Sequence, residues 1–205
     1  MKNIEFTGDI QFGEQKIDRI AVAPLLFVAF AKLWEDVSAD TASRKGKALA
    51  LMQRKRIVHQ THFMSGDKRV LPDDAQIAQL PIPVARSIIA HLDDDQGTVG
   101  KLLNDGDGVA TPVHYQLGTP IQLAAKGDGK PQQISELEFK ASTFGELEDV
   151  LATSGEVPQT AHLLRTIAKP VEIATLTSLP SWAVDRITVA DGVTISNLVL
   201  PRFLG

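Results

Sequence analysis

The second half of the chain contains two stretches in which apolar and polar residues alternate, separated by a turn-rich segment. Residues 115–123 and 134–139 carry the alternation, and residues 127–131 between them read Gly-Asp-Gly-Lys-Pro. A period of two indicates strands that bury one face. The pattern therefore predicts two strands joined by a loop, and the rest of the chain is interpreted around them.

A helix is predicted directly after the second strand. Ser142 or Thr143 stands at its N-cap, and Glu146 follows Thr143 at the spacing of a capping box. Apolar residues then recur at helical spacing and predict one buried face, made of Phe144, Leu147, Val150 and Leu151.

The first half shows a similar pattern of strands followed by helices. Its predicted elements are strands over 4–12 and 17–22, helices over 25–37, 44–59 and 84–92, and a hairpin over 63–70. The predicted elements elsewhere are a short helix capped by Asp73 or Asp74, helices over 160–168 and 180–189, and a final helix over 192–200 capped by Asp191. Residues 93–112 concentrate acids and glycines, which predicts a connection that buries little surface.

The predicted fold class is α+β, with two related units, each a β-hairpin followed by α-helices. Ile-Gln pairs at 10–11 and 121–122, and Glu-Asp-Val triplets at 35–37 and 148–150, favour an internal duplication. Binary periodicity alone is the alternative explanation for this likeness. The predicted division is a unit over 1–95 with a basic helical and hairpin insert at about 41–70, a linker over 96–112, and a second unit over 113–205.

Composition restricts the class of protein without naming a function. Hydrophobic residues make up 43% and charged residues 22% of the 205 residues, which is typical of a globular chain, and the absence of cysteine excludes disulfides and thiolate metal sites. The polar N-terminus and the shortness of the longest apolar run, at 20–31, favour a soluble cytoplasmic protein without membrane association.

No pattern of catalytic or metal-binding residues stands out. His59 and His62 lack further ligands at a known spacing, and residues 104–108 fail the alternating acid pattern of a calcium loop. Nucleophile, phosphate-loop and dinucleotide motifs are missing as well. We therefore expect no enzymatic activity, no cofactor and no metal.

Basic residues and tryptophans are the candidates for partner binding. Residues 41–70 hold eight Lys or Arg against one Asp, while the whole chain has a net charge of −4. This basic segment suggests an acidic protein partner, with nucleic acid as a less favoured alternative because stacking aromatics are scarce there. The candidate partner-binding residues are Trp34, Trp182, Arg44, Lys47, Arg54, Lys55 and Arg56.

Short motifs in the second half carry a family resemblance. Residues 117–121 read LGTPI, 135–137 read SEL, and 143–148 read TFGELE; residues 176–185 and 202–204 continue the pattern. Together they resemble the tail assembly chaperones of long-tailed bacteriophages, in particular those of Mu-like and P2-like phages. The chain is longer than a typical member, and its basic insert has no counterpart in the second half.

The resemblance implies a viral protein of phage tail assembly. Such a chaperone would bind tail tube and tape measure proteins in the host cytoplasm and mask their exposed surfaces by protein–protein interaction. A structural component of the tail or baseplate, retained in the virion, is the main alternative. A nucleic-acid-binding accessory protein is the third. Self-association of the chain stays open.

Overall fold

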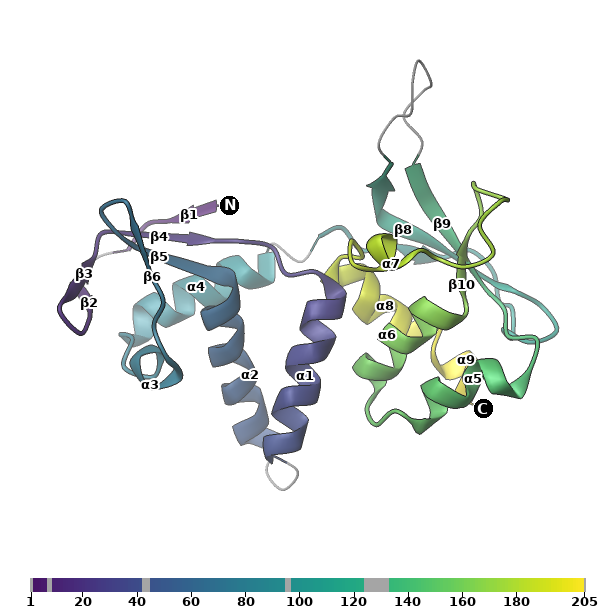
Figure 1. The fold of residues 1–205 in the computed structure, drawn as a ribbon, viewed down its shortest axis with the longest axis horizontal. Coiled ribbons are helices and arrows are strands. Elements are labelled where there is room, and N and C mark those ends of the chain that lie inside the picture. Colours follow the sequence, from purple (N-terminus) through teal and green to yellow (C-terminus); the bar gives the residue numbers. More distant parts are fainter. Residues whose placement is uncertain (1, 7–8, 42–44, 95–96, 124–132, 205) are drawn as a thin grey trace, which may run out of the picture. The chain divides into compact units, whose positions relative to one another are not determined.

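The computed structural model describes residues 2–6, 9–41, 45–94, 97–123 and 133–204. Backbone contacts divide the chain into two compact units. Unit 1 comprises Met1–Leu25 and Leu33–Gln96, and unit 2 comprises Leu26–Lys32 and Gly97–Gly205. In Figure 1 most of unit 1 is coloured from purple to teal and most of unit 2 from teal to yellow.

Unit 1 is built on an antiparallel sheet with strand order β1-β4-β5-β6 (Figure 1). Its strands are β1 (Lys2–Ile4), β4 (Arg19–Val22), β5 (Thr61–Ser65) and β6 (Lys68–Val70). The hairpin of β2 (Ile10–Phe12) and β3 (Gln15–Ile17) lies between β1 and β4 in the chain. Its turn contains Gly13 at φ 62°, a backbone conformation that favours glycine.

The helices of unit 1 are α2 (Lys45–Gln60), α3 (Asp74–Ile77) and α4 (Ile82–Asp94), together with the part of α1 (Phe27–Thr41) from Leu33 onward. Helices α2 and α4 contact the strands of the sheet, and α2, α3 and α4 all contribute side chains to a largely aliphatic core. In α4 the residues Val84, Ile88 and Leu92 are buried at helical spacing, as the sequence predicted. They join Ile20 and Phe63 of the sheet in one hydrophobic cluster.

Unit 2 has a second antiparallel sheet, with strand order β10-β9-β8-β7. Its strands are β7 (Lys101–Leu102), β8 (Val113–Gln122), β9 (Gln133–Phe139) and β10 (Ala168–Pro170). Its other helices are α5 (Phe144–Ala152), α6 (Glu156–Thr166), α7 (Ser181–Val184), α8 (Val189–Leu198) and α9 (Pro201–Leu204). The cluster of buried side chains here includes Tyr115, Leu137, Phe139 and Leu164.

The α+β class is confirmed, and so is the succession of strand, strand and helix in the second half. The loop predicted at 127–131 lies outside the described residues. Thr143 is the N-cap of α5, and the Glu146 carboxylate accepts hydrogen bonds from the amides of Ser142 at 2.6 Å and Thr143 at 3.3 Å. None of the helices in the described ranges is long and apolar enough to cross a membrane.

Several predicted details are wrong. Phe144 is 74% exposed instead of buried on the inner face of α5. The helix predicted over 180–189 is only the short α7, and α8 begins at Val189 with Thr188 as its N-cap, so Asp191 lies inside the helix. The stretch predicted as a linker contains β7, and from Gly97 onward it belongs to unit 2.

Candidate protein-binding site

A groove with a volume of about 550 Å³ lies between α2, α3 and α4 of unit 1. We call it the α2–α4 groove. Its floor is formed by Ile57, Ile77 and Leu80, and each of these side chains is less than one tenth exposed. Its other lining residues are Leu49, Ala50, Gln53, Arg54, Ala78, Ile82, Ala85, Arg86 and Ile89.

The sequence places these side chains by simple helical geometry. The buried face of α4 consists of Val84, Ile88 and Leu92. Ile82, Ala85 and Arg86 lie next to this face on the helix and line the groove. On the opposite side the short helix α3 is fixed by a capping box. The Gln76 amide donates to Asp73 Oδ1 at 2.8 Å, and the Asp73 amide donates to Gln76 Oε1 at 3.0 Å.

The groove combines apolar surface with positive charge. Leu49 is 58% exposed and Ile82 is 69% exposed, which leaves large aliphatic side chains facing water. Arg54 and Arg86 line the same groove, and its lining residues include no carboxylate. An amphipathic helix that carries acidic residues beside its apolar face would complement both features.

Arg56, another predicted partner-binding residue, belongs to the interior of unit 1. Its side chain is nearly buried, and its guanidinium contacts Asp93 Oδ1 at 2.7 Å, Gln53 Oε1 at 3.2 Å and Gln60 Oε1 at 3.3 Å. Gln60 in turn donates to the carbonyl of Ala23 at 3.2 Å. Arg56 therefore ties α2 to α4 and to the end of β4 instead of presenting charge to a partner.

The remaining basic candidates fall in different settings. Arg54 lines the groove, and Lys55 is half-buried on α2. Lys47 belongs to α2, but its side chain is outside what the structure describes, and Arg44 lies outside the described residues altogether. Of the predicted basic residues whose side chains the structure describes, Arg54 is the one that lines the α2–α4 groove.

The two tryptophans do not occupy comparable positions in their units. Trp34 lies on α1, the first helix after β4, and is half-buried. Trp182 lies on α7, after β10, and is 43% exposed. The guanidinium carbon of Arg186 lies 5.5 Å from the centre of the Trp182 ring, a cation–π contact within unit 2.

The acids and histidines considered from the sequence have local roles. Asp107 accepts hydrogen bonds from the amides of Val109 and Thr111 at 3.0 and 2.8 Å, and these bonds hold its pKa below the usual value. Burial lowers the pKa of His62, with a further contribution from the charge of Arg69. Within the described ranges, no group of three or more potential ligands is arranged to hold a metal ion.

Sequence reasoning missed Leu49, Ile82 and Arg86 as a joint surface. Leu49 lies within the helix predicted over 44–59, where nothing distinguishes it from the buried apolar residues, and Ile82 lies between two prolines, where no helical period could be recognised. The sequence feature that could have indicated this surface is the excess of apolar residues in α4 beyond its buried residues Val84, Ile88 and Leu92. No protein-family model, curated protein sequence or solved structure matches the chain.

Proposed function

We propose that this chain is a non-enzymatic phage tail morphogenesis protein. In this proposal it acts as an assembly chaperone in the host cytoplasm and binds a segment of a tail tube or tape measure protein. The resemblance of residues 117–121, 135–137 and 143–148 supports the class of function. The observation that carries the mode of binding is the α2–α4 groove, where exposed Leu49 and Ile82 accompany Arg54 and Arg86.

The proposed mechanism is reversible masking of an amphipathic helix. Burial of each exposed aliphatic side chain contributes about 1.5–3 kcal/mol at most. Association costs at least about 4 kcal/mol in lost freedom of motion. A groove that offers Leu49 and Ile82 as its largest exposed side chains therefore suits a contact that forms and releases, as a chaperone needs.

Co-expression with the tail tube and tape measure proteins tests this mode of binding. Ile82→Glu removes exposed apolar surface and places a carboxylate one turn from Arg86, where it would compete with an acidic partner. A negative charge in the first turn of α4 favours the helix, so folding should be retained. We expect Ile82→Glu to reduce co-purification of the tail protein at least about tenfold, the effect of losing roughly 1.4 kcal/mol.

Leu71→Glu is the matched control, because Leu71 is 75% exposed in the same unit and does not line the groove. The Leu71→Glu chain should co-purify as much of the tail protein as the wild-type chain does. Equal retention by both variants would rule out the groove as the binding surface.

Quantitative mass spectrometry of purified mature particles separates the chaperone from a tail or baseplate component. The chaperone should be missing from finished particles. Its presence at a stoichiometry that fits tail symmetry would instead establish the structural alternative.

A further inference from the structure

The hairpins of the two units share an irregular register. In unit 1, Ile4 pairs with Ile20 and Ile10 pairs with Ile17, so the two pairs are six positions apart on the first side of the hairpin and three apart on the second. In unit 2, Tyr115 pairs with Leu137 and Ile121 pairs with Ile134, which is the same spacing. Register sets which side chains face the core, so the two hairpins match residue by residue.

The elements around the hairpins correspond in the same way. A helix starts at Phe27 and at Phe144, five residues after Val22 and Phe139, which end the matching strands β4 and β9. After a second helix, β5 pairs with β4 and β10 pairs with β9, both antiparallel. A later helix then contacts the first hairpin strand, α4 on β1 and α8 on β8. This agreement supports the predicted duplication and makes β1 the counterpart of β8.

In unit 2 the outer edge of β8 is covered by β7. Lys101 pairs with Gln116 and Leu102 with Tyr115, and the Leu103 amide donates to the His114 carbonyl at 2.8 Å. The segment leading into β7 passes very close to the sheet. A Cβ on Gly100 would lie 2.2 Å from the Gln116 carbonyl oxygen, so only glycine fits there.

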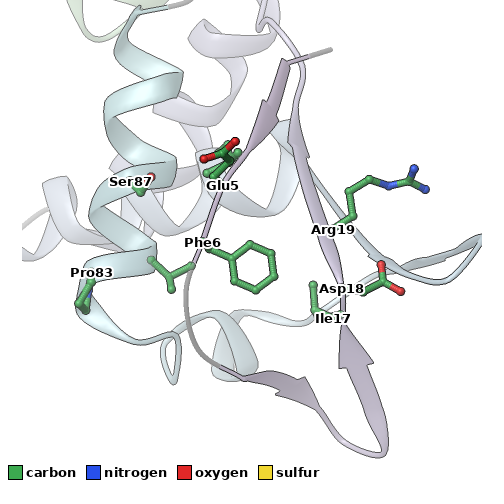
Figure 2. Close-up of a pocket in the computed structure, with 9 residues that line it drawn as sticks. Glu5, Phe6, Ile17, Asp18, Arg19, Pro83 and Ser87 are labelled. Carbon is green, nitrogen blue, oxygen red and sulfur yellow. The ribbon is translucent and has the colours of Figure 1, made fainter.

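In unit 1, no strand within the described residues covers the corresponding edge of β1. A pocket of about 780 Å³ lies where the chain leaves β1, lined by Ile4 and the two residues after it, by residues 17–19 and by the first turns of α4. Figure 2 shows the ring of Phe6 between the two strands, with Pro83 and Ser87 on the facing helix. Glu5 follows β1 directly and is exposed.

We infer that the edge of β1 is a docking site for an extended peptide segment of a partner protein, which adds to the sheet as an antiparallel strand. The segment takes the place that β7 has on β8, and its apolar side chains enter the pocket beside Phe6. This strand addition uses a different surface from the α2–α4 groove and does not depend on the function proposed above.

The register also specifies the chemistry of the occupant. The counterpart of Gln116 is Glu5, and the counterpart of Tyr115 is Ile4. A bound strand in the register of β7 therefore places one side chain opposite the Glu5 carboxylate and the next opposite Ile4. A basic residue followed by an apolar residue, as in Lys101-Leu102, satisfies both positions.

The test uses a synthetic peptide with the sequence of residues 97–103, GTVGKLL, added to the full chain. Hydrogen exchange should show new protection at residues 3–6. Glu5→Lys turns an attractive cross-strand pair into a repulsive one, which should weaken binding about fivefold. A second peptide with Glu at the Lys101 position should reverse the preference, binding the Glu5→Lys chain better than the wild type.

Glu5 is exposed, so its replacement should leave folding unchanged, which circular dichroism would verify. Three results would overturn the inference: no saturable binding, equal binding of both peptides to both chains, or protection at residues 113–117 through exchange with β7. None of these results would bear on the groove, whose lining residues remain unaltered.

Discussion

At the scale of single residues, Asp191 is the most consequential polar group in unit 2. It is fully buried, and its carboxylate accepts hydrogen bonds from Tyr115 Oη at 3.0 Å, the Gly118 amide at 2.9 Å and Thr188 Oγ1 at 3.0 Å. These bonds join β8 to the first turn of α8. A buried carboxylate is tolerated here because several donors converge on it.

The first prediction concerns alkaline stability. Burial raises the pKa of Tyr115 well above its ordinary value, with a further contribution from the charge of Asp191. A group whose pKa is raised on folding binds its proton more tightly in the folded chain. Its contribution to the free energy of unfolding is therefore complete below about pH 10 and falls as the pH rises further.

Tyr115 is the single tyrosine of the chain, so tyrosinate absorbance reports its titration directly. The native chain should titrate at higher pH than the chain unfolded in denaturant. Tyr115→Phe should lower the free energy of unfolding by about 1.5–3 kcal/mol at neutral pH, because the hydrogen bond from Tyr115 to the Asp191 carboxylate is lost. Identical titration of the native and unfolded chains would refute the proposed environment of Tyr115.

The second prediction concerns Arg56. Arg56→Ala should lower the free energy of unfolding by about 1.5–3 kcal/mol, because the contacts to Asp93, Gln53 and Gln60 are lost from a nearly buried position. Lys55→Ala, a half-buried neighbour on the same helix, should cost no more than about 0.5 kcal/mol. Urea denaturation compares the two, and equal losses would mean that Arg56 has no special structural role.

The sequence could not predict the role of Arg56. It stands in a run of three basic residues, which is typical of a solvated face, and its carboxylate partner Asp93 is 37 positions away. Only the packing of α2 against α4 brings the two together. Local composition describes the charge of a segment but does not identify which of its residues is enclosed.

At the scale of elements, the features that depend on near neighbours were predictable. The cap of α5, the buried stripe of α4 and the turn before β6 follow from residues within a few positions of each other. By contrast, Phe144 continues the helical period of α5 but is exposed at its first turn, where the core does not reach. Strand β7 was missed because two residues within an acidic, glycine-rich stretch carry no periodic signal.

The third prediction tests the cap of α5. Glu146→Ala should lower the free energy of unfolding by about 1 kcal/mol, because the carboxylate no longer accepts the amide hydrogen bonds of Ser142 and Thr143. Glu148→Ala lies on the exposed side of the same helix and should have a much smaller effect. Chemical denaturation of both variants measures the difference. A Glu148→Ala loss as large as that of Glu146→Ala would argue for general charge effects instead of a cap.

At the scale of the whole molecule, the α+β class was accessible from the sequence, and the groove proposed as the binding surface was not. The α2–α4 groove draws Leu49, Ile77 and Ile82 from three helices, and no motif of fixed spacing connects them. The basic segment contributes Arg54 to the groove, and whether it binds a partner stays a prediction. It did not separate Arg54 from Arg56, whose settings differ only in the folded chain.

The central claim is that tail assembly requires the α2–α4 groove. The most direct measurement is the yield of tailed particles from a phage deleted for this gene and complemented with wild-type, Ile82→Glu or Leu71→Glu chains. We expect the wild-type and Leu71→Glu chains to restore tails and Ile82→Glu to fail, at equal levels of folded protein. Full restoration by Ile82→Glu, or normal tails without the gene, would contradict it.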